Sequence, residues 1–236
     1  MSDLSLAALE TALRQDCAYG LLGESHAHRA VREDSLTLIK GRDAIVAAWV
    51  GEGRQQVAID ADLGAMIAYQ VDGAWHGHRW VWREDGRILR EVVVENRGVA
   101  QSPPAVHPPL GELNAGRGQY ATAEAALLPA DFPESVRPLA DRLHRAWNGR
   151  AFDLYGSDWL PCLIRLIPDA HFQFERAIVL GDNIALLWRV MGHDAGGQRI
   201  RLIGSSLFQG DMDQTLLDWA ALAVQQQQPL IDYSGG

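Results

Sequence analysis

The segment AWHGHRWVW, residues 74–82, places two histidines and three tryptophans in nine positions. Imidazole groups can bind a metal ion or exchange protons with a ligand near neutral pH. The segment is rich in aromatic residues, which favours a β-strand, and alternate side chains of a strand share one face. Arg79 is then expected on one face. The histidines and two of the tryptophans share the other face: His76, His78, Trp80 and Trp82.

This aromatic face has three interpretations. His76 and His78 could bind a metal if a neighbouring strand supplied a third ligand. A second pair, His26 and His28, lies in a segment that we predict to be helical. Residues two apart on a helix point in different directions, so we expect no bound metal. The face could instead pack in the core with its imidazoles hydrogen-bonded, or line a ligand cavity in which one imidazole acts on the ligand.

Other side chains in the first half could also act on a ligand. Glu91 lies in a predicted strand and could serve as a general base if burial raised its pKa. It could equally form a structural ion pair with Arg79 or Arg87 across the adjacent hairpin. Tyr69 and Tyr19 could each donate a hydrogen bond to a ligand oxygen, or be core aromatic residues with satisfied hydroxyl groups.

A segment rich in proline and glycine, residues 101–118, divides the chain into two halves, 1–100 and 119–236, that follow similar plans. In the first half we expect helices within 4–25, 26–34 and 41–50, and strands at 35–40, 55–62, 65–71, 74–84 and 87–96. In the second half we expect helices at 135–149 and 150–159, and strands at 170–180, 183–193, 198–209 and 214–225, the last of which could be helical. Helices packed against antiparallel sheets give an α+β fold class.

Two short motifs carry a family resemblance. GRDAI at residues 41–45 opens the third predicted helix, and DGRI at 85–88 opens the last strand of the first half. In this order of elements, they resemble the SnoaL-like branch of the nuclear transport factor 2-like superfamily. The second half is similar at residues 145–159 and 177–192 but lacks a copy of GRDAI. The resemblance implies two cone-shaped, cystatin-like domains in tandem, each with helices on a curved antiparallel sheet.

The resemblance also implies a cavity at the wide end of each cone, lined by carboxylates, histidines and tyrosines. Glu91 matches an acidic position of the family's final strand, whereas Asn96 stands where an aspartate is common. An amide cannot accept a proton at neutral pH, so Asn96 is expected to contact a ligand only. In the second half, Asp218 and Trp219 match an acidic residue and tryptophan of the last strand. We see no convergent set of groups there and expect a scaffold or pseudo-dimer partner.

Composition limits the partners. The net charge is -9 and the pI is about 5.3, which argues against nucleic acid and anionic membranes as partners. The sequence shows no apolar run of membrane-spanning length and no signal segment. Cys17 and Cys162 lie far apart and are expected to stay reduced in a cytoplasmic protein. We expect the two halves to form a pseudo-dimer within the chain, and a homodimer also remains open.

Two functions are compatible with these features. The first is a cofactor-free acid–base enzyme of the isomerase, cyclase or hydratase type, acting on a small hydrophobic molecule in the first cone. Glu91 would be the base, with His76 or His78 as its partner. The ligand-binding residues would be Trp80, Trp82, Tyr69, Tyr19 and Asn96. The alternative is a non-catalytic module that binds a small ligand or serves assembly.

Overall fold

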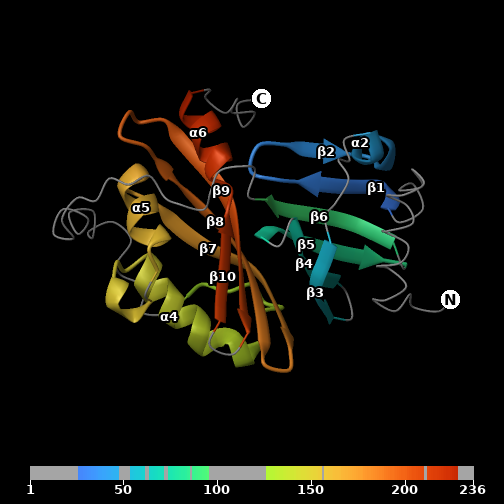
Figure 1. Ribbon diagram of the computed structural model, residues 1–236, viewed down its shortest axis with the longest axis horizontal. Helices are drawn as coiled ribbons and strands as arrows, with labels where there is room; N and C mark the ends of the chain where they lie inside the picture. The colour runs from blue at the N-terminus through green and yellow to red at the C-terminus, as the bar shows by residue number, and fades with distance from the viewer. Residues whose placement is uncertain are drawn as a thin grey trace.

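The computed structural model describes residues 26–47, 54–61, 64–71, 74–85, 87–95, 126–155, 157–209 and 212–227. These residues form a six-stranded and a four-stranded β-sheet with few helices, a mixed α+β architecture (Figure 1). None of the helices among them combines the length and apolar character needed to cross a membrane. The helix expected within residues 4–25 and the linker at 101–118 lie outside the described residues.

The first sheet contains strands from the N-terminal half in the order β2-β1-β6-β5-β4-β3. Its elements are β1 (His26–Glu33), β2 (Leu38–Lys40), α2 (Arg42–Ala47), β3 (Arg54–Ala61), β4 (Gly64–Val71), β5 (Ala74–Glu84) and β6 (Arg87–Glu95). Strands β3 to β6 form the antiparallel meander that the sequence predicts. Asp85 adopts a left-handed φ of 50° in the turn between β5 and β6, as the Asp-Gly pair leads us to expect.

The second sheet is antiparallel throughout, in the order β10-β9-β8-β7. The elements of this half are η1 (Glu134–Val136), α4 (Arg137–Trp147), η2 (Phe152–Leu154), α5 (Trp159–Leu166), β7 (His171–Leu180), β8 (Asn183–His193), β9 (Arg199–Gln209), β10 (Met212–Leu217) and α6 (Trp219–Gln227). Helices α4 and α5 cover the face of this sheet that is turned away from the first sheet (Figure 1).

The helix expected at residues 26–34 is wrong, because this segment forms strand β1. β1 lies between β2 and β6, pairing antiparallel with β2 and parallel with β6. Two neighbouring strands satisfy the backbone groups of β1, and this outweighs the weak helical pattern of the segment. As a result Glu33 is in register with Val92 of β6 and points towards the second sheet.

Two predictions in the second half also need correction. The short helix expected at 150–159 is only the 3-10 turn at Phe152–Leu154, and the true helix α5 begins at Trp159. The last predicted strand is divided, since β10 ends before Asp218 and α6 follows. The Oδ1 atom of Asp218 accepts a hydrogen bond from the backbone N–H of Ala221 at 2.9 Å, so this acidic residue caps a helix instead of lying in a strand.

Two apolar clusters make up the core. The larger lies between the second sheet and helices α4 and α5, and its centre is Trp147. The smaller fills the contact between the sheets, with residues from both: Met66, Ala68, Trp80, Val92, Val94, Ile178, Ala185, Leu187, Ile203, Leu207 and Leu216. We call this contact between the two sheets the seam. Alternation along each strand therefore decides whether a side chain faces the seam or the outer side of its sheet.

Candidate functional site

His78 and Trp80 face the seam and meet one serine of the second sheet. The Oγ atom of Ser205, on β9, lies 2.9 Å from Nδ1 of His78 and accepts a hydrogen bond of 2.9 Å from Nε1 of Trp80. All three side chains are fully buried. The serine hydroxyl can donate to Nδ1 of His78 or accept from it, depending on the imidazole tautomer.

Burial also fixes the charge state of His78. Desolvation lowers the pKa of this imidazole from 6.5 to about 3, so the ring is neutral at physiological pH. A neutral imidazole enclosed between two sheets is a hydrogen-bonding group of the core. The structure thus places His78 in the packing between the sheets, one of the interpretations left open by the sequence.

Glu91 points to the opposite face of the first sheet. On that face Nε of Arg79 lies 2.5 Å from Oε1 of Glu91, and the two side chains are 2% and 0% exposed. The ion-pair interpretation of Glu91 is therefore the one observed, with Arg79 as the partner. Since His78 and Glu91 lie on opposite faces of one sheet, the structure does not bring the predicted base and imidazole together.

The other residues predicted for this site are placed only in part. Tyr19 and Asn96 lie outside the described residues, as do the side chains of His76 and Tyr69. Trp82 packs at the edge of the smaller apolar cluster. No shared site of these residues is seen among the described side chains of the first half.

Two positively charged side chains lie over the ring of Trp82 at the seam. The guanidinium carbons of Arg90 and Arg176 each lie 4.5 Å from the centroid of its ring. This distance is within the range of cation–π attraction, which stabilises a cation over an indole face. Arg90 comes from the first sheet and Arg176 from the second, so the indole joins the two halves.

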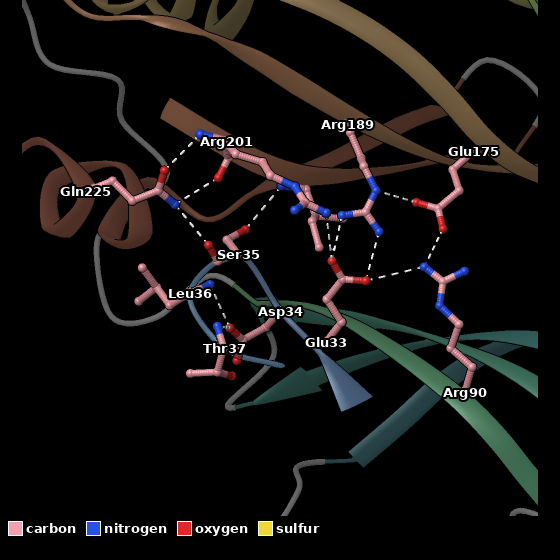
Figure 2. Close-up of polar contacts among 11 residues, drawn as sticks. Glu33, Asp34, Ser35, Leu36, Thr37, Arg90, Glu175, Arg189, Arg201 and Gln225 are labelled. Carbon is pink, nitrogen blue, oxygen red and sulfur yellow. Dashed lines mark hydrogen bonds and ion pairs between the residues drawn. The ribbon is translucent and has the colours of Figure 1, made fainter. Parts of the chain in front are cut away.

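Next to this tryptophan, five charged residues from both sheets form what we call the seam cluster (Figure 2): Glu33, Arg90, Glu175, Arg189 and Arg201. Arg189 donates to both carboxylate oxygens of Glu33, at 2.7 and 2.9 Å, and through Nε to Glu175 at 2.6 Å. Arg90 contacts Glu175 at 2.5 Å and Glu33 at 3.3 Å, and Arg201 contacts Glu33 at 3.1 Å. The carboxylate of Glu33 therefore accepts hydrogen bonds from three arginines.

The electrostatics of the seam cluster favour a charged Glu33. Burial alone raises the pKa of this carboxyl group, but the hydrogen bonds and charge of Arg189, the charge of Arg201 and the hydrogen bond from Arg90 outweigh it. The net effect lowers the pKa of Glu33. The seam cluster thus joins the two sheets through ion pairs.

The turn after Glu33 extends this contact. Asp34 closes the turn by accepting the backbone N–H of Leu36 and Thr37 at 2.8 and 2.7 Å. Ser35 accepts the N–H of Ile203 on β9 at 3.1 Å, and its carbonyl accepts Nε2 of Gln225 on α6 at 2.9 Å (Figure 2). The β1–β2 turn is therefore docked on the second half by both backbone and side-chain bonds.

A different set of polar groups lies on the helical face of the second sheet. Tyr155 follows η2, and its hydroxyl donates a short hydrogen bond to Oδ2 of Asp213 on β10. Oγ1 of Thr215 donates to the other carboxylate oxygen, Oδ1, at 3.0 Å. Asp213, Thr215 and Leu217 alternate onto this face, because Leu217 belongs to the larger cluster beneath the helices.

The environment shifts both groups of the Tyr155–Asp213 pair. Desolvation, and then the nearby charge of Asp213, raise the pKa of Tyr155, so this phenol stays protonated. Desolvation raises the pKa of Asp213, although the hydrogen bonds from Tyr155 and Thr215 act in the opposite direction. A protonated donor beside a carboxylate of increased basicity is the combination that general acid–base chemistry needs.

Aromatic side chains surround this pair. Tyr155 meets Trp147 edge-on, with ring centroids 5.9 Å apart, and lies 6.5 Å from the ring of Trp159. Trp159 in turn stacks on Trp188 at 5.5 Å and an interplanar angle of 15°. Tyr155 is 9% exposed, whereas Asp213 is an exposed residue at the start of β10. Solvent therefore reaches part of the Asp213 residue, and aromatic side chains lie beside its tyrosine partner.

Sequence reasoning missed this pair and expected no site in the second half. Tyr155 and Asp213 are 58 positions apart, and Tyr155 lies in a segment that the sequence wrongly assigns to a helix. Strand parity was the signal available, since it places Asp213 and Thr215 on the side of Leu217. No sequence pattern indicated that Tyr155, which follows η2, would contact the start of β10.

No metal site is evident in the part of the chain that the structure describes, since no three histidine, cysteine, aspartate or glutamate side chains there converge. His193 and Asp169 form a pair, with Nδ1 2.7 Å from Oδ2, and the histidine lowers the pKa of Asp169 against the effect of desolvation. Asp169 lies in the turn before β7, and His193 is the last residue of β8.

Comparisons with known proteins give limited information. The chain matches no known protein-family model, and no curated protein matches it significantly. Among solved structures, it is similar to one from Sinorhizobium meliloti described as a candidate polyketide cyclase, at 20% identity and a TM-score of 0.32, covering 39% of this chain and 99% of that one.

Two further structures are similar over comparable lengths. One, from Bacillus cereus ATCC 10987, is also described as a candidate polyketide cyclase, with 13% identity, a TM-score of 0.34, and coverage of 48% of this chain and 97% of that chain. The other is a nuclear transport factor 2-like protein of unknown function from Burkholderia xenovorans LB400, with 16% identity, a TM-score of 0.28, and coverage of 43% and 94%. With TM-scores below 0.5, these likenesses support no conclusion about activity.

Proposed function

We propose that this protein is a cofactor-free acid–base enzyme that moves a proton on a small apolar molecule, and that its catalytic groups are Tyr155 and Asp213. The observation that carries the proposal is the hydrogen bond from the tyrosine hydroxyl to the carboxylate, with the pKa of both groups raised. The proposed reaction class is the one expected from the sequence. The proposed catalytic site, however, lies in the second half of the chain and not in the first. We also propose that the chain belongs to the SnoaL-like branch, on the strength of GRDAI at residues 41–45 and DGRI at 85–88.

The chemistry follows from the two roles. Asp213 accepts a proton from a carbon next to a carbonyl group. The electron pair of the broken C–H bond forms a carbon–carbon double bond, and the π electrons of the carbonyl group move onto its oxygen. Tyr155 turns its hydroxyl from Asp213 to that oxygen and stabilises the charge that develops there. Asp213 then returns the proton to the same or another carbon. Trp159, the partly exposed aromatic residue beside Tyr155, would contact the apolar part of the substrate.

Exchange of carbon-bound hydrogen tests this proposal without knowledge of the product. The full chain is incubated in D₂O with a panel of small ketones and 1,3-dicarbonyl compounds, and NMR records loss of the proton next to the carbonyl. We expect enzyme-dependent exchange for at least one compound, reduced about 10²–10⁴-fold in Asp213→Asn and in Tyr155→Phe. Asp182→Asn is the matched control, because Asp182 is exposed in the β7–β8 turn. Equal exchange in Asp213→Asn and wild type would refute the assignment.

For the first half we propose an assembly role as the pseudo-dimer partner within the chain. Three sets of contacts support this role: the smaller apolar cluster, the bonds of His78 and Trp80 to Ser205, and the seam cluster. The described polar groups that face the seam are used in holding the second sheet. This role accounts for the burial of His78 on an aromatic strand face.

A further inference from the structure

The carboxylate of Asp213 ends a line of hydrogen-bonding side chains across three neighbouring strands. Nε1 of Trp188, on β8, donates to Oγ of Ser206, on β9, at 3.1 Å. The hydroxyl oxygens of Ser206 and Thr215, on β10, are 2.8 Å apart. Thr215 donates to Oδ1 of Asp213 at 3.0 Å. Ser206 is directly opposite Thr215 in the register, Trp188 is opposite Gly204 and so reaches Ser206 diagonally, and Thr215 reaches Asp213 along β10.

The direction of this line is fixed by its ends. An indole N–H can only donate, an ionised carboxylate can only accept, and each hydroxyl has a single proton. Thr215 uses its proton on Asp213, so it must accept the proton of Ser206, and Ser206 must accept from Trp188. Every bond in the line therefore points its donor towards Asp213. Because the indole keeps its proton, the line cannot conduct protons and acts as a set of aligned dipoles.

The fold makes specific room for the start of the line. A Cβ atom added to Gly204 would lie 2.2 Å from the nearest ring atoms of Trp188, which is closer than any real contact. Only glycine at this position of β9 allows the indole to lie flat on the sheet with Nε1 over Ser206. Ser206 and Trp188 are both fully buried. The line is thus held by packing on its inner side and ends at the accessible Asp213.

We propose that Thr215 is a positioning residue that stabilises the charged form of Asp213 and so sets the pH at which this base becomes active. The inference rests on the proposed function of Asp213. Among the described residues, the side chains that bond to the carboxylate are Tyr155, from the chain after η2, and Thr215, from its own strand, and Phe208 of β9 is opposite Asp213 in the sheet. Of these only Tyr155 is titratable, and it remains protonated. The hydrogen bond from Thr215 opposes the effect of desolvation on Asp213. Its loss is therefore expected to raise the pKa of Asp213.

Carboxyl NMR tests the proposal on the full chain. Protein labelled with 13C at the aspartate carboxyl group is titrated, and the Asp213 signal is identified by its loss in Asp213→Asn. We expect Thr215→Val to raise the pKa of Asp213 by about one unit, the size of effect typical of a hydrogen bond to a charged group. Thr215→Ser keeps the donor and is expected to restore the wild-type value. Ser206→Ala keeps Thr215 as donor and is expected to give a smaller rise.

If Thr215→Val does not fold, Thr215→Ala provides the same loss of a donor with less steric change. An Asp213 pKa that stays within about 0.3 units of wild type in a folded Thr215 variant would overturn the proposal. Equal shifts in Thr215→Ser and Thr215→Val would also overturn it, because a merely structural role predicts them. Failure of the proposed function is seen separately, since Asp213→Asn would then leave hydrogen exchange unchanged whatever the carboxyl titration shows.

Discussion

Replacing Glu33 with glutamine tests the contact between the two halves most severely. The substitution keeps the shape of the side chain and removes the charge that three arginines share. Removal of one partner from a fully buried ion pair costs about 3–5 kcal/mol, whereas an exposed pair is worth below about 1 kcal/mol. Glu33 is 15% exposed, and Arg201 is 49% exposed, so the case is intermediate. We expect Glu33→Gln to lower the free energy of unfolding by about 2 kcal/mol at pH 7.

The pH dependence of this loss has a definite sign. The arginines lower the pKa of folded Glu33 below its ordinary value of 4.5, so the unfolded chain takes up a proton first as the pH falls. The stabilisation is therefore complete above pH 4.5 and is lost as the pH falls through the folded pKa. Below that range wild type and Glu33→Gln should be equally stable.

Urea unfolding of the full chain, followed by tryptophan fluorescence, measures this difference. Glu84→Gln is the control, because the Glu84–Arg29 pair is largely exposed and its loss should change the free energy by less than about 0.5 kcal/mol. High salt should reduce the effect of Glu33→Gln in part. If Glu33→Gln and Glu84→Gln are equally stable, the seam cluster does not hold the halves together.

Three further predictions concern buried groups of the first sheet and the serine of the second sheet that bonds to it. Glu91→Gln leaves the Arg79 guanidinium buried without its counter-charge, and we expect a loss of about 3–5 kcal/mol in urea unfolding, partly recovered by a second change, Arg79→Met. Ser205→Ala removes the hydroxyl that bonds both His78 and Trp80, and should cost roughly 2–4 kcal/mol in the same measurement; a loss below about 0.5 kcal/mol would contradict the packing described. Because the pKa of folded His78 is lowered to about 3, wild type should lose stability as the pH falls from 6.5 towards 3, and His78→Gln should lose less over that range in thermal unfolding at stepped pH.

The meander of the first sheet and its face assignments could be predicted from the sequence. Alternation in AWHGHRWVW placed His78 and Trp80 on one face and Arg79 on the other, and the structure has them so. Which face would be covered by another sheet was beyond this pattern, because it depends on Ser205 and its neighbours more than a hundred positions later. The sequence could therefore not show that His78 would be buried against Ser205.

Other differences arise where tertiary contacts outweigh local pattern. Residues 26–34 have a weak helical pattern, but they form strand β1 because they pair with the neighbouring strands β2 and β6. Asp218 and Trp219 match a strand motif, yet the carboxylate is used to begin a helix. The Tyr155–Asp213 pair joins an irregular segment to a strand edge, and neither periodicity nor spacing reports on such a contact.

The pH profile of carbon–hydrogen exchange in the full chain tests the central claim most directly. With the most reactive carbonyl compound of the panel, the rate should rise with pH through a single ionisation above the ordinary aspartate pKa of 3.8, because desolvation raises the pKa of Asp213. It should then stay level to at least pH 9, because Tyr155 keeps its proton. Asp213→Asn should abolish this rise. A profile that is unchanged in Asp213→Asn, or no enzyme-dependent exchange with any compound, would contradict acid–base catalysis at this pair.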